Sequence, residues 1–272
     1  MSNITEPRGA TKFLLRANAG LVYAFFYVPI VVLVVFSFSD NRNVGVWGGF
    51  TFDWYRDLAD SEPTKDALWA SVQIAAVSTV VSVVLGTMAA LALERFTFRG
   101  KKVFDALLYL PVIIPDVTMA VMMLVFFSQA ANFFGFSKGF TTVTLSHIAF
   151  SISFVSIVVR ARLAGTDDTL EEAALDLGAT RWQAFRHVTL PVIMPGVVGG
   201  GLLALTLSLD DVVITQFVTG SGWTTLPLYV FGLIRRGVTP IINAVSVVML
   251  VASMALVAFS LLAQRIRSHD PV

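Results

Sequence analysis

The sequence predicts an all-α polytopic membrane protein with six transmembrane helices in a single domain, residues 1–272. Two features of the composition lead to this fold class. Hydrophobic residues make up 56% of the chain and mean hydropathy is +0.78. Charged residues make up only 14%, whereas soluble domains carry about a quarter. The third observation is six apolar runs long enough to cross a hydrocarbon layer of about 30 Å. Each run must be helical, because lipid cannot satisfy free backbone groups.

The six spans are expected near residues 20–39, 68–93, 104–127, 141–163, 191–219 and 241–264. The first run follows basic residues, as a signal peptide does. No small-residue cleavage site follows it, and the run is longer than the core of a signal peptide. We therefore expect a retained signal-anchor helix at this position.

Most basic residues lie on one side of the predicted topology. The amino terminus, the 94–103 loop, the 160–190 loop and the tail hold 13 of the 19 Lys and Arg. The 40–66 loop on the opposite side is acidic. Because positive loops stay in the cytoplasm, both termini and the loop at about 164–190 are expected to be cytoplasmic.

The polar 164–190 loop predicts two short helices joined by a turn. Leu170, Ala173, Ala174 and Leu177 form one apolar stripe at helical spacing. Gly178 suits a left-handed helix cap, and Thr180 to Gln183 fits a capping box that starts the second helix. From the residues alone, this segment could either dock on a partner or lie on the bilayer as an amphipathic loop.

A family resemblance distinguishes these alternatives. Glu172-Ala173-Ala174, Gly178, Val188 and Leu190-Pro191 resemble the EAA loop of ABC-importer permeases in residue type and spacing. The resemblance implies the type I importer permease fold, a bacterial inner-membrane location and docking on an ATP-hydrolysing subunit. The residues it assigns to coupling are Glu171, Glu172, Ala173, Ala174, Gly178, Leu190 and Pro191.

The resemblance extends over nearly the whole chain. The segments SLDDVVITQFVTG from Ser208 and TLPLYVFGLIRRGVTPIINA from Thr225 resemble the second permease of spermidine and putrescine importers. That branch implies a second homologous permease, two ATP-binding subunits and a periplasmic binding protein as partners, with lipid around the spans. ATP and Mg would be bound by the partner ATPases.

The chain by itself is not expected to be an enzyme. It contains no GxxxxGK[ST] phosphate loop, so no cofactor is expected on this chain. The absence of cysteine excludes a thiolate metal site, and the three histidines show no metal-ligand spacing. We therefore expect no catalytic residue, no metal and no nucleic-acid partner.

Three carboxylates lie within predicted spans: Asp116, Asp210 and Asp211. Each costs about 2.5–3.5 kcal/mol in lipid on insertion scales, so each should face a cavity or a partner. Ser208, Asp211 and Thr215 share a polar stripe, which favours Asp211 for the substrate pathway and leaves Asp210 braced against a neighbouring helix. Asp116 follows Pro115, so it could instead cap the upper half of a broken helix.

Several alternatives remain open. The cargo could be another small solute, although the carboxylates argue against an anion. A secondary transporter or channel subunit normally needs more spans or an inverted repeat, and a scaffold without transport would have no use for buried charges. The aromatic segment 47–58 could form a headgroup belt or a surface helix that contacts a delivery protein. The glycines at 196 and 199–201 could serve packing or a hinge.

Overall fold

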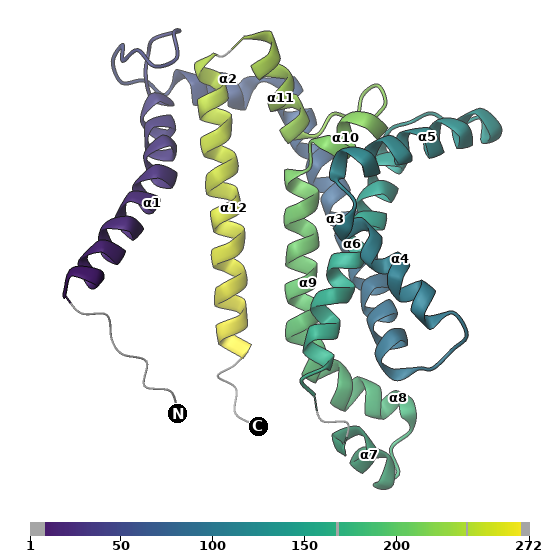
Figure 1. The fold of residues 1–272 in the computed structure, drawn as a ribbon. Coiled ribbons are helices and arrows are strands. Elements are labelled where there is room, and N and C mark those ends of the chain that lie inside the picture. The colour runs from purple at the N-terminus through teal and green to yellow at the C-terminus, as the bar shows by residue number, and fades with distance from the viewer. Residues whose placement is uncertain (1–8, 167–168, 238, 268–272) are drawn as a thin grey trace. The chain divides into compact units, whose positions relative to one another are not determined.

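A computed structural model describes residues 9–166, 169–237 and 239–267 (Figure 1). The helices are α1 (Gly9–Phe36), α2 (Asp53–Asp60), α3 (Glu62–Arg95), α4 (Lys101–Ile113), α5 (Asp116–Phe134), α6 (Phe140–Leu163), α7 (Thr169–Asp176), α8 (Arg181–Ala184), the π-helix η1 (Phe185–Thr189), α9 (Leu190–Asp210), α10 (Val213–Val218), α11 (Leu226–Arg236) and α12 (Pro240–Arg267). The chain divides into one unit of residues 1–61 with 233–252 and another of residues 62–232 with 253–272.

The all-α fold class is confirmed, whereas the count of six spans stays a prediction. Five helices in the described residues are long and apolar enough to cross a membrane: Thr11–Phe36, Glu62–Arg95, Asp116–Phe134, Phe140–Leu163 and Arg181–Asp210. The described apolar part of the last predicted span, Pro240–Ala255, is shorter. The chain is therefore a multi-pass membrane protein.

The third predicted span, 104–127, is wrong as a single helix. α4 ends at Ile113 and α5 begins at Asp116, with Ile114 and Pro115 between them in extended conformation (ψ 132° and 138°). A proline disfavours helical geometry in the residue before it and lacks the amide that a continuing helix needs. Pro115 therefore separates two helices, and the apolar segment of spanning length begins at Asp116.

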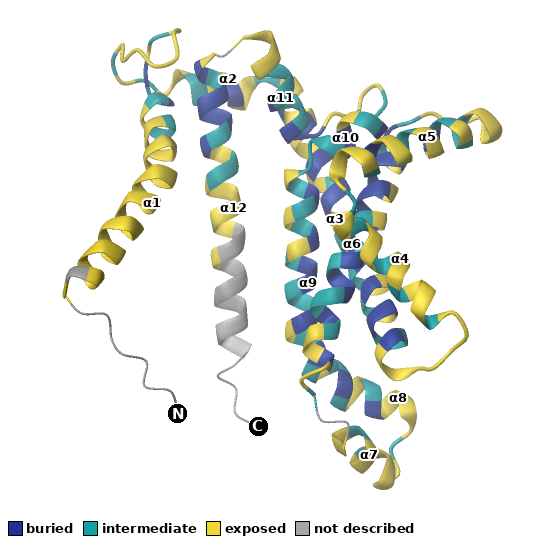
Figure 2. Cartoon of the chain, in the orientation of Figure 1, coloured by how far each residue is buried: buried dark blue, intermediate teal, exposed yellow. Residues whose placement is uncertain are grey.

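Close packing of α3, α6 and α9 forms the centre of the larger unit (Figure 2). Their shared core contains Ala90, Val155, Val159, Leu163, Ile193 and Ala204. Glycines bring the backbones together. A Cβ atom on Gly196 would lie 2.8 Å from Cβ of Arg162, and one on Gly201 would lie 2.9 Å from Val83. Gly196, Gly200 and Gly201 therefore serve close packing, one of the two predicted alternatives, whereas Gly199 has only an ordinary contact.

Gly86 offers a test of this packing. A Cβ atom there would lie 2.7 Å from Cβ of Val155, so Gly86→Ala is expected to lower the free energy of unfolding by about 1–3 kcal/mol through overpacking. Gly199→Ala is the matched control, because its Cβ would meet Val158 at an ordinary 3.8 Å. Thermal unfolding in detergent measures both, and equal midpoints for the two variants would contradict the close approach of α3 and α6.

The smaller unit contains α1 and a folded segment that follows it. α1 is exposed over nearly all of its length. After α1, Ser39 pairs with Phe50 in an isolated bridge, and the Trp54 indole donates to the Ser39 carbonyl oxygen at 2.7 Å. Phe38 packs against the rings of Phe50, Phe52 and Tyr55. The predicted surface helix is present as α2, and its contact with a delivery protein stays a prediction.

Candidate functional site

The polar loop at 164–190 is a helix–turn–helix, as the sequence predicts. Gly178 ends α7 with φ +90°. Its amide donates to the Leu175 carbonyl oxygen at 2.9 Å, and the amide of Ala179 donates to the Ala174 carbonyl oxygen at 3.0 Å. This pair of bonds defines a Schellman motif, which requires the left-handed conformation that glycine adopts without strain.

The second loop helix continues into the fifth span. The Thr180 hydroxyl accepts from the Gln183 amide at 3.3 Å, and the Gln183 side chain accepts from the Thr180 amide at 2.8 Å, so the predicted capping box is confirmed. Helical structure then runs from Arg181 to Asp210. The π turn η1 lies just before Pro191, where the proline ring would otherwise collide with a carbonyl oxygen of the preceding turn. A displacement of α8 can therefore be passed directly to α9.

The outer side of this loop exposes apolar surface. Leu177 is 90% exposed, and Leu170 and Trp182 are more than half exposed. Among the residues that the resemblance assigns to coupling, Glu172, Ala173, Gly178 and Pro191 are exposed, whereas Ala174 and Leu190 are partly buried. Such a surface beside small residues is available to a partner that approaches the helix closely.

Glu171 differs from its neighbours because its carboxylate is held within the chain. It accepts hydrogen bonds from Arg95, at the end of α3, and from the Thr189 hydroxyl of η1 at 2.5 Å. Partial burial acts to raise the pKa of Glu171, but the bonds from Thr189 and Arg95 and the charge of Arg95 outweigh it, and the pKa is lowered. The ionised form is thus favoured, so this bracing persists at neutral pH and is lost only as pH falls below the ordinary glutamate value of about 4.3.

A second ion-pair cluster lies beside the first. Arg160 of α6 donates to Glu94 of α3 at 2.7 Å and to Asp105 of α4 at 2.5 Å. The neighbouring residues Glu94 and Arg95 therefore tie the end of α3 to α4 and α6 on one side and to the loop on the other. This geometry brings the predicted basic loops at 94–103 and 160–190 to the same end of the larger unit.

The fifth predicted span, 191–219, is not one continuous helix. α9 ends at Asp210, Asp211 is extended (φ −69°, ψ 127°), and α10 starts at Val213. The Asp211 carboxylate accepts from the backbone amides of Ile214 and Thr215 at 3.2 and 2.7 Å, and from the Thr215 hydroxyl at 2.7 Å. It therefore satisfies amides that would otherwise be unpaired at the start of α10.

His147 of α6 completes a buried polar network at this break. Its ring nitrogens lie 2.7 Å from Ser208 Oγ and 3.1 Å from Thr215 Oγ1, and Nε2 lies 3.3 Å from Asp211 Oδ2. Ser208 also lies 3.1 Å from Ser78 Oγ of α3. His147 shows no metal-ligand spacing with the other histidines, but an ionisable residue within a predicted span is itself a sign of function.

The structure thus brings Ser208, Asp211 and Thr215 together, but through a helix break and not along a continuous stripe. The carboxylate of Asp211 is only 15% exposed. Asp210 is exposed and forms no hydrogen bond or ion pair with any other described residue, so its predicted bracing against a neighbouring helix has no partner among the described residues. Asp116 is also exposed, in the first turn of α5, and makes no side-chain cap bond there.

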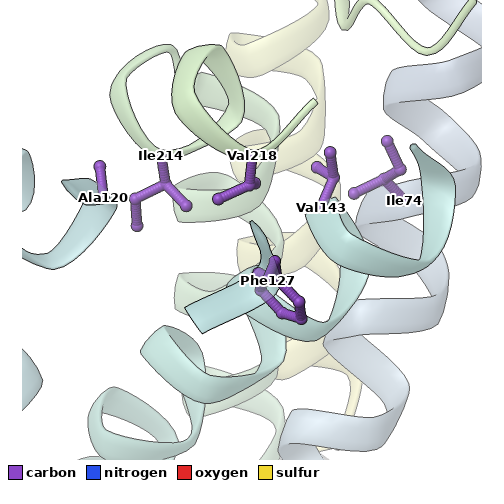
Figure 3. Packing of buried hydrophobic residues seen from close by; sticks show 6 residues of the cluster. All are labelled: Ile74, Ala120, Phe127, Val143, Ile214 and Val218. Carbon is purple, nitrogen blue, oxygen red and sulfur yellow. The ribbon is translucent and has the colours of Figure 1, made fainter. Parts of the chain in front are cut away.

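α10 is held by an apolar cluster on its other side. Ile214 and Val218 pack with Ile74 of α3, Ala120 and Phe127 of α5, and Val143 of α6 (Figure 3). α5 and α10, the helices that follow the two interruptions, therefore pack against each other. Asp116 lies just after the first interruption, and Asp210 and Asp211 lie at the second.

Comparison with known proteins assigns this arrangement to a family. Residues 82–269 match the model of the family described as binding-protein-dependent transport system inner membrane component. The chain belongs to this family. The permease is 41% identical to the putrescine transport system permease protein PotI of Escherichia coli K12, over 98% of this chain and 97% of that protein. It is 39% identical to the spermidine/putrescine transport system permease protein PotC of Haemophilus influenzae, over 94% and 98% of the two chains.

Solved structures of lower identity share the fold of the permease. A bacterial ABC transporter involved in the import of alginate, an acidic polysaccharide, contains a chain that is 21% identical to the permease, with a TM-score of 0.76 over 95% of this chain and 96% of that one. The MetNI methionine ABC transporter contains another, 20% identical, with a TM-score of 0.63 over 78% of this chain and all of that one. The similarity to these transporter chains thus shows the fold of the permease.

Proposed function

We propose that this chain is one of two permeases in an ATP-driven importer of putrescine or spermidine in a bacterial inner membrane. One observation carries the choice of cargo. Two relatives that match this permease over nearly their whole length, at 39% and 41% identity, are named for polyamine transport. The fold alone does not select the cargo, since an alginate importer has it too.

The exposed carboxylates fit a polyamine chemically. A polyamine carries several ammonium groups, and each must lose water as it crosses the membrane. Asp116 and Asp210 are exposed within apolar surroundings, so their charges can offset that loss. In this proposal they face the pathway, and Asp211, Ser208 and Thr215 form its wall by holding α10 in place.

In this proposal the polar loop at 164–190 connects the spans to the ATP-hydrolysing subunits. ATP and Mg would be bound by two partner ATP-binding subunits, and the exposed side of α7 and α8 would dock on one of them. Because helical structure is continuous from α8 into α9, closure of the ATPases would move the fifth span. The loop and both termini would then be cytoplasmic, as the basic residues suggest.

The remaining partners would cover the other surfaces. α1 is exposed along nearly its whole length, so lipid and the second permease would surround it. A periplasmic binding protein would deliver the cargo at the opposite end of the spans.

ATP hydrolysis by the assembled importer tests this proposal. The chain would be purified with its second permease and its ATPases, and the binding protein would be added with or without putrescine. We expect no hydrolysis by the chain alone and faster hydrolysis by the assembly when the binding protein carries putrescine. Stimulation by an anionic or sugar cargo, and none by putrescine or spermidine, would contradict the choice of cargo.

A further inference from the structure

We propose that His147 is a positioning residue for transport, which fixes the angle between α9 and α10 across the break in the fifth span. This inference rests on the proposed transport function. The chain connects the two helices only through Asp211, which is extended, and Val212, which has φ −115° and ψ −39°. With only two residues between the helices, packing against other elements sets the angle. These elements are the apolar cluster around Ile214 and Val218, and His147 of α6, which contacts both helices.

His147 supplies such contacts on both sides of the break. One ring nitrogen, Nδ1, lies 2.7 Å from Ser208 in the last turn of α9. The other, Nε2, lies 3.1 Å from Thr215 in α10 and 3.3 Å from the Asp211 carboxylate. The ring is buried, with 2% exposure. α10 therefore cannot turn relative to α9 without breaking a bond on at least one side of the ring.

The hydrogen positions follow from the number of available protons. The Thr215 hydroxyl donates its one hydrogen to Asp211, so its oxygen accepts from His147 Nε2–H. On the other side, Ser208 either donates to a neutral Nδ1 or accepts from a protonated one. In the second case Ser208 donates to Ser78, which donates to the Ala75 carbonyl oxygen at 3.3 Å. Either placement of the hydrogens therefore keeps contacts on the two sides of the break.

A buried histidine with satisfied hydrogen bonds can also serve stability alone. The test must therefore distinguish a role in fixing the angle between α9 and α10 from a role in folding stability. The amide of asparagine reaches about the position of Nδ1, and that of glutamine reaches about the position of Nε2. His147→Asn should therefore keep the contact to α9 and lose the contact to α10, whereas His147→Gln should do the reverse. Each variant retains a polar partner on one side and is expected to fold.

The angle across the break can be measured directly, because the chain has no cysteine. Spin labels would be attached to cysteines that replace Leu203 of α9 and Gln216 of α10, both exposed positions. In the assembled importer we expect a narrow distance distribution with His147 and broad ones with His147→Asn and His147→Gln. Uptake should fall about five- to tenfold in both variants, the effect of one lost hydrogen bond, with assembly unchanged.

Thr144→Val is the matched control, since Thr144 is buried in the same helix and its hydroxyl has no hydrogen-bond partner. It should leave the distance distribution and uptake unchanged. Narrow distributions and full uptake in both histidine variants would overturn the positioning role. If the distributions broaden as expected but the unmodified importer does not transport a polyamine, the positioning inference stands and the proposed cargo fails.

Discussion

Asp210→Asn is expected to lower polyamine uptake by about ten- to a hundredfold, because a charge-assisted contact is worth roughly 1.5–3 kcal/mol. The substitution keeps the shape of the side chain and removes the negative charge that would compensate a desolvated ammonium group. Asp210 is exposed and makes no polar contact with another described residue. Thermal stability and assembly should therefore stay close to those of the unmodified protein.

Asp211→Asn is the matched comparison and should fail in a different way. Its carboxylate caps α10 and faces His147, so the loss of charge should lower the thermal midpoint and the amount of assembled complex. Labelled spermidine uptake, normalised to the amount of complex, distinguishes the two variants. If normalised uptake is normal for Asp210→Asn and strongly reduced for Asp211→Asn, the role given to Asp210 in the pathway is wrong.

Gly178→Val is expected to reduce uptake more than tenfold while the spans still insert. Gly178 has φ +90°, where an ordinary L-residue costs about 1–2 kcal/mol and a β-branched residue is still less suited. The turn between α7 and α8 should therefore rearrange, and the docking surface should no longer be presented to the ATPase. Uptake and cargo-stimulated ATP hydrolysis would be measured on the assembled complex.

Gly165→Val is the control for this substitution. Gly165 lies in the same loop, its φ is outside the left-handed region, and its nearest contact for a Cβ atom is an ordinary 3.7 Å. This variant should transport nearly normally. Equal loss of uptake in both variants would show that the loop tolerates no added side chain at all and that the left-handed turn has no special part in coupling.

Local chemistry made much of the loop predictable from the sequence. Gly178 and the pair Thr180 and Gln183 act through bonds to residues within a few positions of themselves, and those motifs are visible in the order of residues. The break after Asp210 is different, because no proline or glycine marks it. His147, 64 positions before Asp211, contacts both sides of this break, and no local pattern reveals a contact between two helices.

The roles of the paired aspartates illustrate the same limit. On a continuous helix, Asp211 would share a face with Ser208 and Thr215, which made it the natural candidate for the pathway. Once the helix ends at Asp210, the Asp211 carboxylate turns to the amides of α10 and Asp210 is left exposed. A broken helix at Pro115 was one of the alternatives that the sequence left open, because proline disfavours a continuous helix wherever it occurs.

Uptake of labelled putrescine into reconstituted vesicles tests whether this chain belongs to a polyamine importer. The vesicles would contain this chain, its second permease and the ATPases, with the binding protein outside and ATP inside. We expect putrescine accumulation that requires ATP, requires this chain and is lost with Asp210→Asn. ATP-dependent accumulation of a different solute, with no uptake of putrescine or spermidine by the same active vesicles, would contradict it.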